Sequence, residues 1–429
     1  MSDYLKLTFL ENASDDAIEK VKHHEFRNKP FSNTEVFLVP IEKFELLTKG
    51  QDVRRTYDLK LSTKDILYDF LPGDTIGILP RNHIAEVNEI LIRLNIESRA
   101  EQIYQLTISK DTTKKILQYQ KNIPSNGVLK DIFLYYIDIR KPPKKLWPNF
   151  HLILKKQQNY KKFHHTKGTK EYSELINGGA RTLLGLLNTF SSCLPPLELI
   201  LEHSLPSQPR YYSIASSPLE IDSLHVTFFV VEHDDGTKGV CTGWLEEILK
   251  KTEGEHMKIP IYFRKPNNFR IPIKFSTPII MIATGTGLAP FKGFLDHRLL
   301  SKISKCDMGE AFLYYGCRYS DRDFLYSKQI NDYLKEGVLT SLYTAFSRDR
   351  NEKCYVQDRI NENGETIVNY ILNKDAIVYV CGNTKTMVKD VREAVVNNLV
   401  KYGDLDKQHA DEYLKELVCQ NKFIVDSWS

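Results

Sequence analysis

Several features that assign a protein to a specialised class are missing from this sequence of 429 residues. No apolar run approaches the length of a membrane-crossing helix, and the first residues are too polar for a secretion signal, so we expect neither a membrane anchor nor export. The net charge is only +4, which argues against nucleic acid as the main partner. Internal repeats and low-complexity tracts are also absent, so no repeat architecture is expected.

Cysteine is sparse and is not spaced for bonding. The seven cysteines are odd in number and scattered, and no two of them form a Cys-x-x-Cys pair. This pattern excludes a disulfide framework and a cysteine-rich metal site. We therefore expect a reducing, cytoplasmic setting and no bound metal.

The composition that remains is typical of a folded protein with more than one domain. Hydrophobic residues make up 41% of the chain and charged residues 27%. A chain of this length is too long for one ordinary core, so two or three domains are expected.

Residues 276–299 are the stretch around which the chain is organised. Residues 279–282 form a short apolar, β-branched run, which is typical of a strand buried on both faces of a parallel sheet. Gly285 and Gly287 follow in a turn, and Pro290 suits the first turn of a helix. A helix that begins there presents N–H groups and a positive dipole end to an anionic ligand. Taken alone, the same stretch also fits an ordinary strand–helix connection.

The pattern along the chain divides it into five segments. Residues 1–33 are polar and indicate a linker or a partly helical lead-in. Short alternating apolar runs in residues 34–81 predict the first part of an antiparallel β-barrel, and residues 205–271 predict its second part. Residues 82–204 have helical periodicity and indicate an inserted connecting domain. From 272 to 429 strands alternate with helices, which predicts a doubly wound parallel sheet, so the fold class is a multidomain combination of α+β and α/β parts.

A second chemical cluster lies at residues 210–217. On a strand, Arg210 and Tyr212 project to one face and Ser213 to the other. A guanidinium can grip a pyrophosphate and a tyrosine ring can cover an aromatic ligand. Residues 239–242 then lead into an amphipathic helix, which offers a second anion site. Individually, Arg210 fits a surface arginine and Tyr212 a core tyrosine; only the conjunction of the two sites favours a ligand.

The order of motifs resembles that of a known family. The motifs are Arg-x-Tyr-Ser at 210–213, Gly-Val-Cys-Thr-x-Trp-Leu at 239–245, Gly-Thr-Gly-x-Ala-Pro-Phe at 285–291, Tyr-Tyr-Gly-Cys-Arg at 314–318, Phe-Ser-Arg-Asp at 346–349, Tyr-Val-Gln at 355–357, Val-Tyr-Val-Cys-Gly at 378–382 and Asp-x-Trp-Ser at 426–429. From about residue 33 onward this series resembles the ferredoxin-NADP reductase-like module of the diflavin reductases. Residues 142–145, 192–203 and 239–245 are most similar to the methionine synthase reductase branch.

The resemblance implies that FAD lies over the barrel. Its contacts would come from the second cluster, from the helix start that follows it and from the carboxyl end of the chain: Arg210, Tyr211, Tyr212, Ser213, Gly239, Val240, Cys241, Thr242 and Trp428. In the family, an indole at the position of Trp428 covers the flavin ring and swings aside for nicotinamide. Ser213, Cys381, Asp426 and Trp428 would surround the hydride path. Taken alone, Cys381 also fits a small buried hydrophobic residue.

The second cofactor implied is NADPH. Thr286 and Arg318 would meet its pyrophosphate, while its adenosine 2′-phosphate end would be contacted by Ser347, Arg348, Lys353, Tyr355, Val356 and Gln357. Cations and a hydroxyl are complementary to a phosphate dianion, which favours NADPH over NADH. Asp390 and Arg54 also match family contacts. Without the family context, residues 346–353 fit a charged surface loop, and Asn383 departs from the family, which more often has Asp there.

A flavodoxin-like FMN domain, which diflavin reductases also carry, is not recognisable in the sequence. We therefore expect the chain to take a hydride from NADPH onto FAD and to pass electrons singly to an FMN protein on a separate chain or a missing domain. By its branch, the pathway would be reactivation of cobalamin-dependent methionine synthase. The alternatives are an electron donor to haem proteins, as in NADPH-cytochrome reductases, and a non-catalytic subunit that stabilises a cobalamin enzyme.

Overall fold

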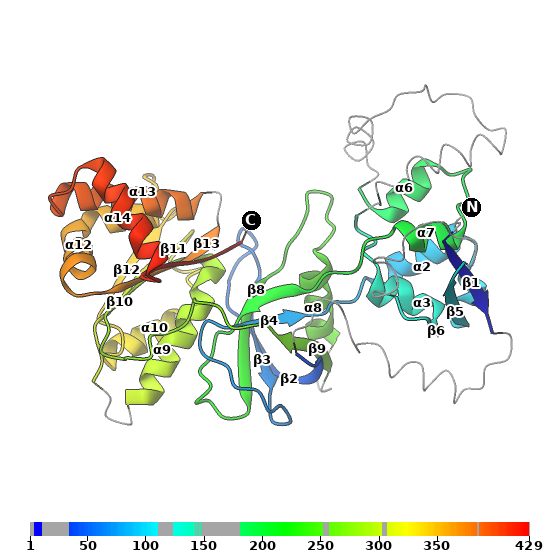
Figure 1. The fold of residues 1–429 in the computed structure, drawn as a ribbon, viewed down its shortest axis with the longest axis horizontal. Coiled ribbons are helices and arrows are strands. Elements are labelled where there is room, and N and C mark those ends of the chain that lie inside the picture. Colours follow the sequence, from blue (N-terminus) through cyan, green and yellow to red (C-terminus); the bar gives the residue numbers. More distant parts are fainter. Residues whose placement is uncertain are drawn as a thin grey trace, which may run out of the picture. The chain divides into compact units, whose positions relative to one another are not determined.

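The computed structural model describes residues 4–10, 34–109, 123–141, 143, 146, 181–251, 257–302, 307–383 and 386–428. The chain forms two compact units, shown as ribbons in Figure 1. One contains Met1–Val36 and Leu79–Arg210, and the other contains Phe37–Ile78 and Tyr211–Ser429. The second unit holds both the barrel and the parallel sheet.

The predicted barrel is present and is closed. Its strands are β2 (Phe37–Leu46), β3 (Thr56–Ser62), β4 (Thr75–Ile78), β7 (Arg210–Ser213), β8 (Ser223–Phe229) and β9 (Lys258–Phe263). They are ordered β7-β4-β9-β2-β3-β8. An antiparallel bridge between Ile214 and Val226 joins the two ends of this sheet. Helix α8 (Val240–Lys251) packs its apolar face, including Leu245 and Ile248, into the barrel core.

Strand β3 has different partners on its two faces. Tyr57, Leu59 and Leu61 alternate along the strand and point into the barrel core. Of the two residues between them, which lie on the outer face, Lys60 is half-buried and Asp58 is nevertheless buried. The barrel is therefore covered on this side by the part of the same unit that contains the parallel sheet.

The predicted doubly wound sheet is also present. Five parallel strands are ordered β12-β11-β10-β13-β14, namely β12 (Ser341–Phe346), β11 (Ala311–Cys317), β10 (Ile279–Thr284), β13 (Ile377–Asn383) and β14 (Phe423–Trp428). Helices α9 (Ala289–Lys302) and α10 (Ser327–Lys335) contribute to one core. Helices α11 (Val356–Glu362), α12 (Gly364–Asn373), α13 (Met387–Tyr402) and α14 (Lys407–Cys419) contribute to the other.

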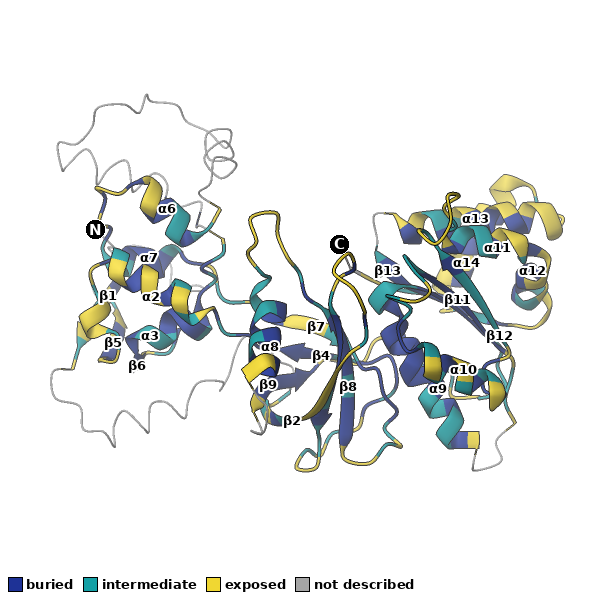
Figure 2. Ribbon diagram, turned by 180° about the vertical axis from the view of Figure 1, so that it is seen from behind, coloured by how far each residue is buried: buried dark blue, intermediate teal, exposed yellow. Residues whose placement is uncertain are grey.

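Strand β10 shows why its sequence is apolar throughout. Ile280 and Ile282 join the core beneath α11 to α14, while Ile279 and Met281 join the core beneath α9 and α10. A central parallel strand with helices on both faces has no solvent side. Figure 2 shows the exposed residues on the outer sides of α12 and α13 instead.

The first unit differs from the helical insert expected for residues 82–204. It contains helices α2 (Ile84–Arg93), α3 (Leu129–Asp131), α6 (Leu183–Thr189) and α7 (Leu197–His203), with a 3-10 turn η1 (Glu97–Arg99) and a short π-helix η3 (Ile132–Tyr136). It also contains an antiparallel sheet ordered β1-β5-β6, from β1 (Leu5–Phe9), β5 (Ile103–Ile108) and β6 (Asn126–Val128). Residues 110–122 and 147–180 of the expected insert lie outside the described residues.

Strand β1 corrects part of the interpretation of residues 1–33 as a linker or a partly helical lead-in, because this stretch contributes a strand to a sheet. Leu5 pairs opposite Ile108, and Tyr4 and Leu5 are buried in the core of the first unit. The alternation of apolar and polar residues in β1 is a strand pattern, but it is too short to stand out from its polar surroundings.

Among the described residues, no helix has the length and apolar character needed to cross a bilayer.

Candidate active site

The glycine turn forms at the carboxyl end of β10, as predicted. The strand ends at Thr284, a short 3-10 turn covers Gly285–Leu288, and α9 begins at Ala289 with Pro290 in its first turn. Gly285 has φ of 53°, a conformation that glycine adopts readily, and a Cβ built there would meet no atom within 4 Å. Open space therefore lies directly beside the start of α9.

A cleft of about 680 Å³ opens at this edge of the sheet. Its size is within the roughly 300–1,000 Å³ usual for cofactor sites. The predicted NADPH residues that line it are Arg54, Thr286, Arg318, Ser347, Tyr355, Val356, Gln357 and Asp390. Thr56 and Phe229 of the barrel also line it, so the cleft lies between the barrel and the parallel sheet.

Two guanidinium groups make this cleft suitable for an anion. Burial lowers the pKa of Arg54, and the nearby positive charge of Arg318 lowers it further. Arg54 lies over the ring of Phe229, 4.6 Å from its centroid, and Arg318 donates to the backbone oxygen of Asp52 at 3.2 Å. Like charges held close together are relieved by a bound anion, so the residues present fit a pyrophosphate.

Arg348 and Lys353 are placed differently from the other predicted nucleotide residues. Both side chains are exposed, and neither lines the cleft. The backbone nevertheless brings Arg348 close, because its N–H donates to the carbonyl of Arg318 at 2.9 Å. Their contact with a 2′-phosphate remains a prediction.

The predicted polar group of the hydride path comes together around Asp426. The Ser213 hydroxyl donates to Oδ2 of Asp426 at 2.9 Å, although the two residues belong to the barrel and to β14. Cys381 is the register partner of Asp426 across β13 and β14. Three residues from distant parts of the sequence therefore meet at the carboxyl edge of the sheet.

Burial controls the protonation of this group. It raises the pKa of Asp426, against the opposing effects of the Ser213 hydrogen bond and the positive charge of Arg264. Burial also raises the pKa of the Cys381 thiol well above its ordinary value, and the Asp426 charge adds to this. Cys381 is therefore a neutral thiol rather than a nucleophilic thiolate, which suits packing and orientation.

Trp428 ends β14 opposite Asn383, which lines the 680 Å³ cleft. The indole side chain lies outside the described residues, so its predicted stacking on a flavin remains a prediction.

The tyrosines of β7 are divided between two environments. Tyr212 is half-buried against the barrel core and its hydroxyl donates to Sγ of Cys241 at 3.4 Å. Tyr211 is exposed beneath the guanidinium of Arg264, 4.1 Å from the ring centroid. Tyr262 donates to the Tyr211 hydroxyl at 3.2 Å. An aromatic and cationic surface therefore adjoins Ser213.

Arg210 is exposed, and its guanidinium donates to the carbonyl of Gln208 at 2.8 Å. This bond uses only part of the guanidinium, so its other N–H groups are left to bind a ligand. Its predicted contact with pyrophosphate remains a prediction.

At the start of α8 the side chains serve the fold. The Thr242 hydroxyl accepts from the Val231 N–H at 3.1 Å, and Cys241 is buried in the barrel core. The Gly239 N–H donates to the carbonyl of Val231 at 2.9 Å. Of the predicted residues 239–242, an anion can be contacted by backbone N–H groups of the first helical turn, such as that of Val240, and by the hydroxyl hydrogen of Thr242, which the bond from Val231 does not use.

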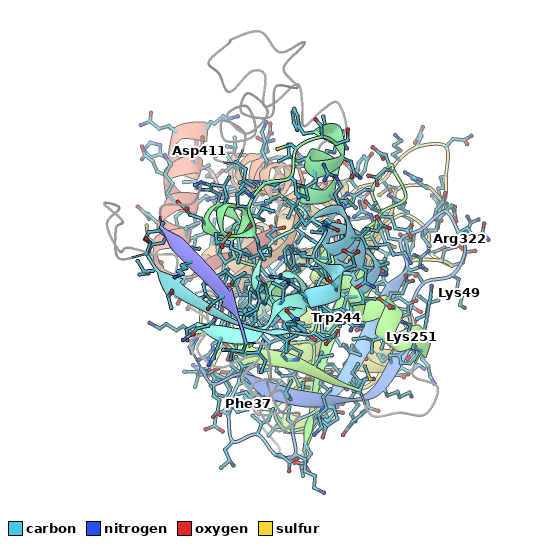
Figure 3. All side chains as sticks on the ribbon, turned by 90° about the vertical axis from the view of Figure 1, so that its right-hand side faces the viewer. Phe37, Lys49, Trp244, Lys251, Arg322 and Asp411 are labelled. Carbon is cyan, nitrogen blue, oxygen red and sulfur yellow. The ribbon has the colours of Figure 1, made fainter. Side chains whose placement is uncertain are left out.

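A buried carboxylate that sequence reasoning missed fixes this helix. Glu246 accepts from Arg55 at 2.6 Å, from Lys238 at 2.5 Å and from the Tyr57 hydroxyl at 3.3 Å. Burial opposes ionisation, but the Lys238 and Arg55 bonds prevail and lower the pKa of Glu246 to about 2. In the sequence, the only indication that Glu246 fixes this helix is its position on the apolar face of the helix. Figure 3 labels Trp244 and Lys251 on the same helix.

Comparisons with known proteins identify two cofactor-binding domains in this chain. The family model of the FAD binding domain matches residues 29–244, about half of the chain, and that of the oxidoreductase NAD-binding domain matches residues 281–393. Methionine synthase reductase of Rattus norvegicus is 34% identical over 433 residues, covering 93% of this chain and 62% of that protein. The Homo sapiens protein of the same name is 35% identical, with 92% and 61% covered.

A second group of relatives has a different name. NADPH–cytochrome P450 reductase of Bos taurus is 31% identical over 428 residues, covering 96% of this chain and 61% of that protein. The chain thus spans about three fifths of the length of the curated relatives it matches. The matched domains confirm the predicted cofactors, FAD and NADP(H), and the predicted fold class. The chain belongs to the diflavin reductase family, as an FAD- and NADPH-binding oxidoreductase module similar to the corresponding part of methionine synthase reductases.

Proposed function

We propose that this chain accepts a hydride from NADPH onto FAD and passes the electrons one at a time to an FMN-binding protein or domain. The observation that carries the proposal is the meeting of Ser213 of the barrel with Asp426 and Cys381 at the carboxyl edge of the parallel sheet. When bound, FAD supplies the change from two-electron to one-electron transfer, which no amino-acid side chain can provide.

The residues around that point would orient the ligand rings and keep water away from them. Ser213 donates its hydroxyl hydrogen to Asp426, which fixes the direction of the hydroxyl and leaves its oxygen to accept a hydrogen bond from a donor atom of a ligand on the barrel side. Cys381, buried and neutral, gives a small and adaptable surface against which a ring can lie. Trp428, at the end of β14, would shield the flavin ring in the absence of nucleotide and would be displaced by nicotinamide.

The nucleotide side is proposed to select NADPH. Thr286, Arg54 and Arg318 would hold the pyrophosphate, and Ser347 with Arg348 and Lys353 would hold the 2′-phosphate. Tyr355, Val356 and Gln357 would contact the adenine end, with Asp390 beside it. On the barrel, Arg210 and the first turn of α8, from Gly239 to Thr242, would hold the pyrophosphate of FAD.

The proposed pathway is that of the methionine synthase reductases. The relatives with that name are 34% and 35% identical, against 31% for the P450 reductase. The final acceptor would be methionine synthase with its bound cobalamin, reached through an FMN protein. The proposed setting is a reducing, cytoplasmic one, and no cysteine among the described residues forms a disulfide.

The purified chain tests the proposal directly. We expect a yellow protein whose flavin absorbance bleaches when NADPH is added without oxygen. Adding a flavodoxin-like FMN protein should then restore reduction of methionine synthase cobalamin. Preferential reduction of a cytochrome would favour the haem-protein alternative, suggested by the P450 reductase relatives. A colourless protein that ignores NADPH but stabilises a cobalamin enzyme would reject the reductase in favour of a binding subunit.

A further inference from the structure

One connection in the parallel sheet contacts the barrel and its β2–β3 connection, near the middle of the segment and at its last residue. Residues 318–326, named here the coupling segment, lead from β11 to α10. Near its middle, Arg322 pairs with Asp52 at 2.6 Å and its carbonyl accepts from the Lys49 N–H at 2.8 Å. Figure 3 shows Lys49 and Arg322 on the surface at this place. An exposed ion pair of this kind contributes little by itself.

The last residue of the coupling segment makes a stronger contact. Tyr326 is buried, and its hydroxyl donates to Oδ1 of Asp58 at 2.6 Å. The same hydroxyl lies 2.7 Å from Oγ1 of Thr227. Because its only hydrogen goes to Asp58, Thr227 must donate to it. Asp58 and Thr227 are register partners on the outer face of β3 and β8, so both hold the tyrosine from one rung of the barrel.

The acceptor in this contact is charged. Burial would raise the pKa of Asp58, but the hydrogen bonds from His225 and Tyr326 bring it below its ordinary value. His225 contacts the other carboxylate oxygen at 2.7 Å. Hydrogen bonds to an ionised and buried acceptor are stronger and shorter than neutral ones. Tyr326 is therefore held tightly at a site in which each oxygen has a partner.

The backbone of Tyr326 supports the same conclusion. Its φ is 54°, in the left-handed region that a bulky residue seldom adopts. Glycine or asparagine would be the usual choice at such a position before a helix. A tyrosine in this conformation has a cost in conformational energy, and the contact of its side chain with the barrel offsets that cost.

This contact joins the two walls of the nucleotide cleft. Arg318, Asp323 and Leu325 of the coupling segment line the cleft on one side. Thr56 and Phe229 line it on the barrel side, and they form the pair two residues along the same ladder from Asp58 and Thr227. We propose that Tyr326 is a positioning residue: its bond to Asp58 and Thr227 holds the nucleotide wall against the flavin barrel and so sets how NADPH meets the flavin. This inference rests on the function proposed above.

Binding of NADP⁺ to the holoprotein, measured by calorimetry, tests the inference without relying on turnover. We expect Tyr326→Phe to weaken NADP⁺ by about tenfold, since it leaves buried partners without a bond. Thr227→Val should weaken it less, and the double variant should be no worse than Tyr326→Phe alone. Thr227→Ser, which keeps the hydroxyl, should restore the wild-type affinity. Bound FAD content and its visible spectrum should stay unchanged in all of them.

Tyr104→Phe is the matched control. It also removes a buried tyrosine hydroxyl, bonded to the carbonyl of Pro124 at 2.9 Å, but in the first unit. It should leave NADP⁺ affinity unchanged. Amide hydrogen exchange supplies a second measurement: residues 318–325 should exchange faster in Tyr326→Phe and at the wild-type rate in Tyr104→Phe.

Unchanged NADP⁺ affinity and unchanged exchange in Tyr326→Phe would overturn the inference. If that variant does not fold, Thr227→Val against Thr227→Ser decides the same question, and equal affinities of these two would overturn it. If the wild-type protein does not bind NADP⁺ at all, the proposed function fails instead. The exchange comparison would then still show whether Tyr326 holds the coupling segment.

Discussion

The two helix starts that could bind phosphate use their residues in opposite ways. At the start of α9, Gly285 leaves open space, and Arg54 and Arg318 reach the same cleft from neighbouring segments. At the start of α8, the side chain of Cys241 packs in the barrel core and that of Thr242 accepts a hydrogen bond from the barrel. The nucleotide would therefore be selected by replaceable side chains, whereas FAD would be held by the barrel fold itself. Substitutions at the α9 site should therefore change nucleotide affinity without changing the stability of the fold. Substitutions at the α8 site should change FAD affinity and stability together.

The largest effect is expected from Glu246→Gln. It removes the charge that holds Arg55 and Lys238 at α8, and we expect a loss of about 2–3 kcal/mol of unfolding free energy, less than for a fully buried pair because both cations are partly exposed. Urea unfolding followed by FAD release measures it, and the two should change together. Glu247→Gln, which breaks an exposed pair with Lys251, is the control and should change little.

The same carboxylate gives a pH dependence. Because the pKa of Glu246 falls to about 2 in the folded protein from 4.5, its contribution is complete above pH 4.5. It is lost as the pH falls from there towards 2. The stability difference between wild type and Glu246→Gln should therefore narrow over that window, and a constant difference would contradict the assignment.

A second effect should appear at the nucleotide site without any cost in stability. Replacing both Arg348 and Lys353 by alanine should weaken NADPH by about thirtyfold, because charged hydrogen bonds to a phosphate are lost. NADH, which lacks the 2′-phosphate, should be almost unaffected. Steady-state KM values for both nucleotides measure this, and equal losses would reject the 2′-phosphate assignment.

Arg54→Ala should give a smaller change that is common to both nucleotides. Its charge adjoins Arg318 and would face the pyrophosphate, which NADPH and NADH share. We expect an affinity loss of about fivefold to tenfold, and an unfolding midpoint close to wild type. Calorimetric titration measures the first and a urea transition the second; a large drop in stability would mean that Arg54 serves the fold, like Glu246.

The smallest effect is expected from Trp428→Ala. Removing the indole should lower the cost of placing nicotinamide against the flavin by about 1 kcal/mol. NADH, which binds with less energy from its adenine end, should gain more than NADPH. A ratio of kcat/KM for the two nucleotides equal to that of the wild type would contradict the gating role.

Local patterns in the sequence predicted the elements and left the long-range contacts to the family resemblance. The apolar run 279–282 and the glycines after it specify strand, turn and helix by themselves, and the structure has them there. The Ser213–Asp426 bond joins residues that no spacing connects, so only the resemblance could place them together. Glu246 and Tyr326 were missed because a buried carboxylate and a buried hydroxyl take their roles from partners far away in the chain.

Strand β1 was missed for a different reason. Five residues with an alternating pattern carry little information until a partner strand is known, and its partner β5 begins about a hundred residues later. For Arg348 and Lys353 the difficulty is the reverse: the residues were predicted, but the structure does not place them against a ligand. The resemblance names them, but exposed side chains of this length take a definite position only against a ligand.

The closure of the barrel beside Ser213 has a consequence for how the protein can vary. Ile214 bridges to Val226, and its N–H donates to the carbonyl of Asp74, so both ends of the sheet meet one residue after Ser213. Gly293 lets α9 lie directly on this seam, since a Cβ there would come within 3.1 Å of the Ile214 carbonyl. Inserting or deleting a single residue in 210–216 would turn Ser213 to the opposite face. If Ser213 has its proposed role, the length of this segment would be as strict a requirement as the identity of the serine itself.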